Sequence, residues 1–142
     1  MATTFRELTE SDGDVAATLW RDVDLVRAWN DPDGDFRSAI AGATSAVLGA
    51  EIDGVLVGTV MVGFDGHRGW LYYVAVAPIA QRRGVGTELT RRAEQWLKER
   101  GAHKVQLMVR RGNDAPRLFY TELGYEPSDV TVFQKWIDPD AS

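Results

Sequence analysis

The chain contains no cysteine, no long apolar run and no excess of basic residues. The absence of cysteine excludes disulfide frameworks, cysteine-ligated zinc and thiol nucleophiles, and it is typical of proteins from a reducing cytoplasm. The first residues lack the basic and apolar regions of a signal peptide, and no stretch approaches the roughly 20 apolar residues that span a bilayer. We therefore expect a cytoplasmic protein without a membrane segment.

The charge of the chain argues against a nucleic-acid partner. The net charge is −5 at pH 7, whereas phosphate backbones are bound by clustered Lys and Arg. One local exception is Arg82-Arg83, followed by Arg91-Arg92, and a small basic cluster on an acidic chain favours a small anionic ligand. The chain has only two histidines, far apart and without a ligand motif, so no metal site is predicted.

What is present is the composition of a globular protein. Hydrophobic residues make up 44% and charged residues 26% of 142 residues, which fits one domain of residues 1–142 with a single core. The apolar periodicity and turn signals predict strands at 4–8, 45–52, 55–64, 70–76 and 104–109, with final strand material at 125–126 and 130–137. Helices are predicted around 15–20 and 36–43, at about 84–100 and at 115–123.

This order of elements predicts an α/β (α+β) fold. Asp53-Gly54 is a strong signal for a two-residue hairpin. The strand at 70–76, the long helix and the strand at 104–109 form a βαβ unit, so these two strands should be parallel, whereas the earlier strands are antiparallel. We expect a mixed, mostly antiparallel sheet of 6–7 strands, flanked by about 4 helices.

The segment from Val76 to Thr87 lies between a strand and the start of a helix. A helix N-terminus offers unpaired N–H groups and a partial positive charge to a phosphate. Gly84 and Gly86 let the backbone approach an anion, and the arginines before them add cationic donors. Taken alone, the two glycines fit a plain turn better than a binding site, because such a pair before a helix is common as turn geometry. Neither the P-loop pattern nor the third glycine of the dinucleotide fingerprint is present.

Two separated motifs resemble those of GNAT acetyltransferases. The run from Gln81 to Gly86 matches the Gln/Arg-x-x-Gly-x-Gly/Ala signature, and the run from Asn113 to Tyr125 resembles Asn-x-x-Ala-x-x-Phe-Tyr-x-x-x-Gly-Phe, with Pro116 in place of an alanine. The opening residues 5–12 are also similar to the family, so the resemblance covers nearly the whole chain. It implies the GNAT fold and an acetyl-CoA-dependent N-acetyltransferase. Segments 26–32 and 65–69 further resemble the bacterial YpeA-type subgroup.

The resemblance implies a binding site for acetyl-CoA where the strands at 70–76 and 104–109 part. The expected cofactor-binding residues are Val74, Ala75, Val76, Gln81, Arg82, Arg83, Gly84, Val85, Gly86, Thr87, Asn113, Phe119 and Tyr120. Tyr120 occupies the position of the family's general acid, which protonates the departing CoA thiolate. The alternative for Tyr120 is a core aromatic side chain on a short helix.

The acceptor side of the site is less defined. We expect Trp29, Asn30, Asp31 and Tyr72 to bind the substrate, although a solvated turn is the simpler interpretation of residues 30–35. Family members often place a carboxylate general base four residues before a bulge in the central strand, and this chain has Trp70 at that position. A water relay with Tyr72, Asp31 and Glu51 remain the alternatives for this role.

We thus expect transfer of an acetyl group from acetyl-CoA to a primary amine of a small molecule, protein or peptide. The amine attacks directly and passes through a tetrahedral intermediate, because no cysteine is available for an acyl-enzyme. A longer acyl-CoA is an alternative donor. A non-catalytic acyl-CoA sensor or a protein-interaction module is the alternative from another class. Fold analogy alone supports a homodimer.

Overall fold

The computed structural model describes residues 2–138 and 140, and it consists of two compact units. The first unit ends at Leu107 and contains the sheet with the helices that cover it. The second begins at Met108 and contains one α-helix. In the described part of the chain, no helix is long and apolar enough to cross a bilayer.

The sheet of the first unit follows the order of the chain. Its strands are β1 (Thr3–Glu7), β2 (Ser45–Ile52), β3 (Val55–Phe64), β4 (Gly69–Val76) and β5 (Val105–Gln106), and each pairs with the next. Strands β1 to β4 pair with one another in antiparallel fashion, and β5 is parallel to β4, as predicted. The β2–β3 turn has φ angles of 51° at Asp53 and 78° at Gly54. Two positive φ angles are what a type I′ hairpin turn requires.

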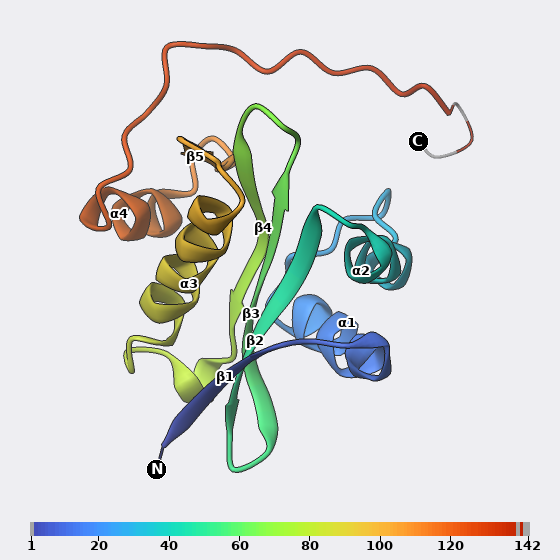
Figure 1. The fold of residues 1–142 in the computed structure, drawn as a ribbon, viewed down its shortest axis with the longest axis vertical. Helices are drawn as coiled ribbons and strands as arrows, with labels where there is room; N and C mark the ends of the chain where they lie inside the picture. Colours follow the sequence, from blue (N-terminus) through green and yellow to red (C-terminus); the bar gives the residue numbers. More distant parts are fainter. Residues whose placement is uncertain (1, 139, 141–142) are drawn as a thin grey trace. The chain divides into compact units, whose positions relative to one another are not determined.

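Helices cover both faces of this sheet. The short 3₁₀ helix η1 (Glu10–Asp12), α1 (Gly13–Asp22) and α2 (Pro32–Ala41) precede β2, while η2 (Pro78–Ala80) and α3 (Val85–Glu99) connect β4 to β5. In Figure 1, α1 and α2 lie on one face of the sheet and α3 lies on the other. The mixed α+β fold with helices on both faces is therefore confirmed.

The core consists of two clusters, one on each face, because successive strand residues point to opposite sides. Val60 and Val62 of β3 pack with Leu89 and Leu97 of α3. On the other face, Trp20 of α1 and Phe36 of α2 are fully buried, and their ring centroids lie 6.1 Å apart. The helices on both faces thus hold the sheet through large apolar side chains.

The start of α2 differs from the prediction. We expected a turn through residue 35, but the helix already begins at Pro32. Asp31 is its N-cap, and its carboxylate accepts a hydrogen bond of 3.0 Å from the Gly34 N–H. Proline is favoured at the first helical position because it has no N–H to satisfy there, so these turn-like residues cap a helix.

The predicted number of strands is wrong: the sheet has five strands and not 6–7. The strand expected at 104–109 is only two residues long, and neither 125–126 nor 130–137 forms a strand. The Tyr125 N–H instead donates to the Tyr120 carbonyl at 2.9 Å and closes the preceding helix. An alternating apolar pattern such as that of 130–137 makes a strand only when a partner strand is available, and no described residue pairs with it.

Candidate active site

The most unusual feature of β4 is a β-bulge near its end. Thr59 of β3 pairs with Ala75, whereas Met61 pairs with Tyr72, so β4 carries one extra residue between these pairs. Tyr73 lies in the bulge and has φ of +49°. A positive φ at a residue with a bulky side chain costs about 1–2 kcal/mol, and such strain persists only where the surroundings impose it.

The bulge reverses the direction of the side chains along β4. Leu71 and Val74 are three residues apart, yet both pack in the cluster on the α3 side. Tyr73 and Ala75 pack in the opposite cluster with α1 and α2. Ala75 is one of the expected cofactor residues. Its side chain is buried in this cluster, so only its backbone is available to a ligand.

A chain of hydrogen bonds holds the bulge in place. The Trp20 indole N–H donates to the Thr59 hydroxyl at 2.8 Å, and this hydroxyl donates to the Tyr73 carbonyl at 2.9 Å. The Trp20 ring stacks on the Tyr73 ring with centroids 3.9 Å apart. The Tyr73 phenol donates to Asp35 at 2.7 Å. Burial is the main cause that raises the pKa of Tyr73 well above 10, and the hydrogen bond to Asp35 raises it further.

Beyond its first residues, β4 has a free edge. It pairs with β5 only through Gly69 with Val105 and Trp70 with Gln106. From residue 71 to residue 76, no described strand pairs with β4 on that side. Backbone groups along such an edge are available to an extended ligand, which is the arrangement expected for a pantetheine arm.

The turn after β4 presents an open backbone. Arg82 and Gly84 have φ angles of 66° and 74°, and a Cβ added to Gly84 would have no atom within 4 Å. The Gln81 amide donates to the Val76 carbonyl at 3.4 Å, which is a long contact. Because the space beside Gly84 is empty of protein atoms, a ligand can reach the backbone there.

The N-terminus of α3 follows this turn directly. Gly84 is its N-cap, and the side chain of Val85 is 2% exposed and anchors the first turn. Gly86 and Thr87 are partly buried, while Arg82 and Arg83 are exposed. Free N–H groups, the positive end of a helix dipole and two guanidinium groups suit a pyrophosphate or phosphate. The residues present therefore fit the anionic part of CoA.

The second unit contains the other expected site residues. Helix α4 (Asp114–Glu122) begins after its N-cap Asn113, and Pro116 lies in its first turn, where proline is tolerated. Phe119 and Tyr120 make an edge-to-face contact with centroids 4.9 Å apart. Burial raises the pKa of Tyr120 to about 12. The phenol is therefore protonated at neutral pH, which is the state that a general acid needs.

The expected acceptor residues near α2 have local structural roles. Trp29 is 49% exposed. The Asn30 side-chain oxygen accepts a hydrogen bond of 2.9 Å from the Arg27 N–H. One oxygen of Asp31 caps α2. Asn30 and Asp31 thus shape the loop, while the exposed indole of Trp29 is accessible to a substrate.

Two candidates for the general base, Tyr72 and Glu51, differ in their accessibility to a substrate. Tyr72 is 43% exposed, and its ring stacks on that of Trp70 with centroids 6.4 Å apart. Burial and the charge of Asp65 raise the pKa of Tyr72. Glu51 accepts a hydrogen bond of 3.0 Å from Arg6. Glu51 is thus committed to an ion pair, whereas Tyr72 is accessible.

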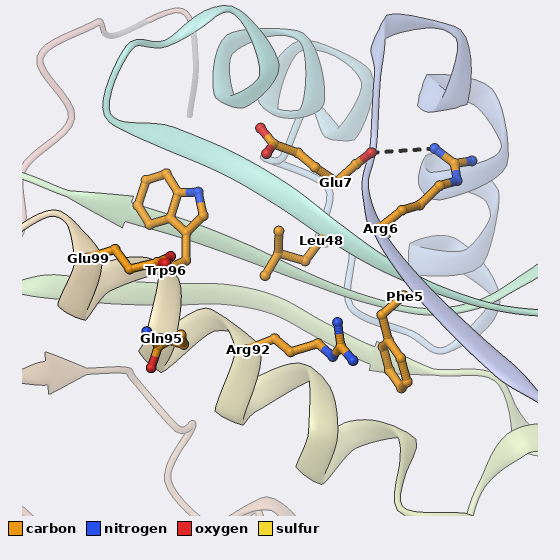
Figure 2. A pocket seen from close by; sticks show the side chains of 8 residues that line it. All are labelled: Phe5, Arg6, Glu7, Leu48, Arg92, Gln95, Trp96 and Glu99. Carbon is orange, nitrogen blue, oxygen red and sulfur yellow. Dashed lines mark hydrogen bonds between the residues drawn. The ribbon is translucent and has the colours of Figure 1, made fainter.

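A groove of about 290 Å³ lies elsewhere on the first unit, between β1, β2 and α3. Figure 2 shows the side chains that line it, and the Trp96 indole N–H buried there has no acceptor among the described residues. None of the expected site residues contributes to the lining, which consists of Phe5, Arg6, Glu7, Leu48, Arg92, Gln95, Trp96 and Glu99. Residues 2–138 and 140 contain no cluster of three metal-ligating side chains.

Sequence reasoning did not single out Trp20, Thr59, Tyr73 or Asp35. Trp20 was expected only as a buried helical residue, and the family resemblance implied a bulge in the central strand without the contacts that hold it. One clue was available: Thr59 is a polar residue inside the apolar run of β3 and is fully buried. A buried hydroxyl needs hydrogen-bond partners, and its partners here lead to the bulge.

Comparison with known proteins places this architecture among acetyltransferases. Residues 11–125 match the Acetyltransferase (GNAT) family. AAC(6')-Iy in complex with the bisubstrate analogue CoA-S-monomethyl-acetylneamine has a TM-score of 0.83 at 16% identity, with 96% of this chain and 99% of that chain covered. Ribosomal-protein-alanine N-acetyltransferase from Brucella melitensis biovar Abortus 2308 has a TM-score of 0.75 at 20% identity, covering 96% and 99%.

A third similar structure is a predicted acetyltransferase with acetyl-CoA from Clostridium acetobutylicum. Its TM-score is 0.79 at 16% identity, and 94% of this chain and 96% of that chain are covered. At these identities the structures share the fold with this chain. The family match includes most of the chain, from α1 through α4. The chain belongs to the GNAT family of acetyltransferases.

Proposed function

We propose that this protein transfers the acetyl group of acetyl-CoA to a primary amine of a small molecule or peptide. The observation that carries the proposal is the open turn at Arg82–Gly84, which leads from the free edge of β4 into the N-terminus of α3. Similar structures hold a CoA bisubstrate analogue or acetyl-CoA. These likenesses and the local fit support the same donor here.

The residues of the first unit bind the donor in this proposal. The N–H groups at the start of α3, with Arg82 and Arg83, neutralise the pyrophosphate. The backbone of Val74 and Val76 bonds the pantetheine arm and the thioester carbonyl. Bound there, acetyl-CoA supplies an activated acyl group, and a donor N–H at its carbonyl stabilises the negative charge that develops there on attack.

The second unit carries the other residues to which we assign a role. We assign Asn113 and Phe119 to contacts with the donor, and Tyr120 to proton donation to the departing thiolate. A phenol with a pKa of about 12 is protonated at neutral pH, so it has a proton to donate as negative charge develops on the sulfur. The family match across residues 11–125 includes all of these assigned residues, which supports their roles.

The acceptor is a primary amine that reaches the thioester beside Trp29 and Tyr72. Similar structures include aminoglycoside acetyltransferases and a ribosomal-protein-alanine acetyltransferase, so the proposal includes both cationic small molecules and peptide amines. An amine arrives mostly protonated at neutral pH. We propose that a water relay through Tyr72, or the Asp31 carboxylate, removes this proton, because Glu51 is bound to Arg6.

Calorimetric titration with acetyl-CoA, with ATP and NAD as controls, tests the donor site directly. Selective binding of acetyl-CoA supports the proposal, whereas no binding by the folded protein contradicts it. A panel of amines is then screened for release of CoA.

Catalysis is tested by Tyr120→Phe, which removes only the phenolic oxygen. We expect kcat to fall about 100-fold with the Kd for acetyl-CoA unchanged. Tyr125→Phe is the matched control, since Tyr125 packs against Tyr120 with centroids 5.7 Å apart and should retain activity. Binding of acetyl-CoA without turnover of any amine would instead identify a non-catalytic acyl-CoA sensor.

A further inference from the structure

The bulge of β4 fixes the direction of one peptide group. The Tyr73 carbonyl and the Val74 N–H belong to the same planar trans peptide, so they point in opposite directions. The Thr59 hydroxyl binds this carbonyl from the β3 side at 2.9 Å. The Val74 N–H is therefore directed away from β3, toward the edge of β4 that β5 no longer covers.

The Thr59 hydroxyl is itself held by a second donor. It accepts the indole N–H of Trp20 at 2.8 Å, and both side chains are fully buried. A hydroxyl that accepts one hydrogen bond from Trp20 has its own proton left to donate, and the Tyr73 carbonyl is its acceptor. The direction of the hydroxyl proton is thus set by α1, on the opposite face of the sheet from α3.

A third contact fixes Tyr73 from its side chain. Its ring stacks on Trp20, and its phenol donates to Asp35 at 2.7 Å. The peptide is thereby held at both the backbone and the side chain, in a conformation with φ of +49° that an isolated tyrosine avoids. The surroundings of the bulge therefore maintain a geometry that the local sequence does not favour.

We propose that Trp20 and Thr59 are positioning residues that aim the Val74 N–H at the thioester carbonyl of acetyl-CoA. They act through the Tyr73 carbonyl and do not touch the donor themselves. The inference rests on the proposed function, because it concerns the same thioester-binding backbone. It adds that α1 and β3, which lie outside the family's two sequence motifs, set the orientation of the hydrogen-bond donor.

The test compares binding of acetyl-CoA with binding of CoA, which lacks the thioester carbonyl. In Thr59→Val, the shape of the side chain is kept and the hydroxyl is lost. We expect the preference for acetyl-CoA over CoA to fall about tenfold, and kcat to fall by a similar factor. Both losses are smaller than the loss for deleting an oxyanion donor outright. The affinity for CoA should stay as in the wild type. Thr59→Ser restores the hydroxyl and should restore both values.

Two further variants separate positioning from stability. Thr59→Val leaves the buried Trp20 N–H without its acceptor, which destabilises the fold. The double variant Trp20→Phe/Thr59→Val removes both partners, so it should recover much of the melting temperature but not the preference for acetyl-CoA. Ser45→Ala is the matched control, because it removes a hydroxyl bonded to the Ala39 carbonyl at 2.8 Å, and it should keep the wild-type preference.

The outcomes distinguish this inference from the proposed function. Wild-type protein that fails to bind acetyl-CoA overturns the proposed function and this role together. If the wild type binds acetyl-CoA and folded Thr59→Val keeps both the wild-type preference and the wild-type kcat, the positioning role alone is overturned. An equal loss of acetyl-CoA and CoA affinity in both Thr59→Val and the double variant also overturns it, because such a loss reflects the fold and not the thioester contact.

Discussion

At the scale of single residues, Arg6 links three parts of the first unit. Its guanidinium binds Asp12 of η1 at 2.8 Å and Glu51 of β2 at 3.0 Å. The hydrogen bond from Arg6 lowers the pKa of Asp12 from 3.8 to about 2. The ion pair therefore ties the start of the helical layer to the edge of the sheet through charge as well as packing.

This ion pair gives the stability of the protein a defined dependence on pH. Because the folded-state pKa of Asp12 is depressed, its contribution is fully present above the unfolded value near 3.8 and is lost as the pH falls toward about 2. We expect Asp12→Asn to lower the free energy of unfolding by about 1 kcal/mol at pH 7, a value reduced by solvent screening at a partly exposed pair.

Urea denaturation at pH 7, and again between pH 4 and pH 2, measures this effect. The difference between Asp12→Asn and the wild type should shrink as the pH falls through that range. Asp22→Asn, at the exposed end of α1, is the control and should follow the wild type. A difference that stays constant with pH would show that the ion pair has no part in it.

At the scale of elements, Gly58 allows α3 to lie close to β3. A Cβ at this position would lie 2.9 Å from atoms of Leu89 and Val85 and 3.2 Å from the Ala75 carbonyl oxygen. We expect Gly58→Ala to lower the free energy of unfolding by about 1–3 kcal/mol, the usual cost of overpacking a tight core. Denaturant melts of the two proteins measure this loss.

The same strand offers a matched control. A Cβ on Gly63 would meet its nearest atoms at 3.8 and 3.9 Å, which is ordinary contact. Gly63→Ala should therefore keep the wild-type stability or raise it slightly, because alanine reduces the entropy of the unfolded chain. Equal losses at both glycines would point to strand propensity in place of the approach of the helix.

The elements that could be predicted from sequence are those with strong local signals. Asp53-Gly54 determines its hairpin through its own conformational preference, and the apolar face of α3 is apparent from its spacing. The turn from Gln81 to Gly86, which we propose binds the donor, stood out by its motif. A strand forms only beside a partner strand, and the partners needed beyond Gln106 and at 130–137 would be distant in sequence. Local patterns therefore predicted too many strands and too long a strand at 104–109.

The contacts that hold the bulge could not be predicted for the same reason. Nothing in the local sequence around Tyr73 favours a positive φ, and its conformation results from Trp20, Thr59 and Asp35, which are far from it along the chain. The bulge is therefore a property of packing between elements. Sequence motifs gave the proposed site residues but not the contacts that orient the backbone of β4.

At the scale of the whole molecule, the exposed positions suggest where proteases cleave. Arg82 and Arg83 are exposed in the open turn before α3, and Lys135 is exposed in a segment without helix or strand. We expect brief trypsin digestion to cut at both places. Saturating acetyl-CoA should slow cleavage at the arginines about tenfold or more, since a ligand that binds the folded turn suppresses its opening, and should leave cleavage at Lys135 unchanged.

Mass spectrometry of the fragments resolves the two cleavage sites. ATP serves as the control ligand and should protect neither site. The assignment of Arg82–Gly84 to the donor would be contradicted if acetyl-CoA slowed cleavage only at Lys135. It would also be contradicted if bound acetyl-CoA slowed cleavage at neither site. Because both sites are read in one digest, a general change in protease activity cannot imitate the result.

The order of the strands has a consequence for how the protein folds. Each strand of the sheet pairs with the strand that precedes it in the chain, so no strand has to be inserted between two that are already paired. The β2–β3 hairpin closes through a two-residue turn, and local contacts of this kind form fastest. The sheet can thus grow outward from this hairpin during synthesis, with β5 joining last, after α3 has emerged from the ribosome.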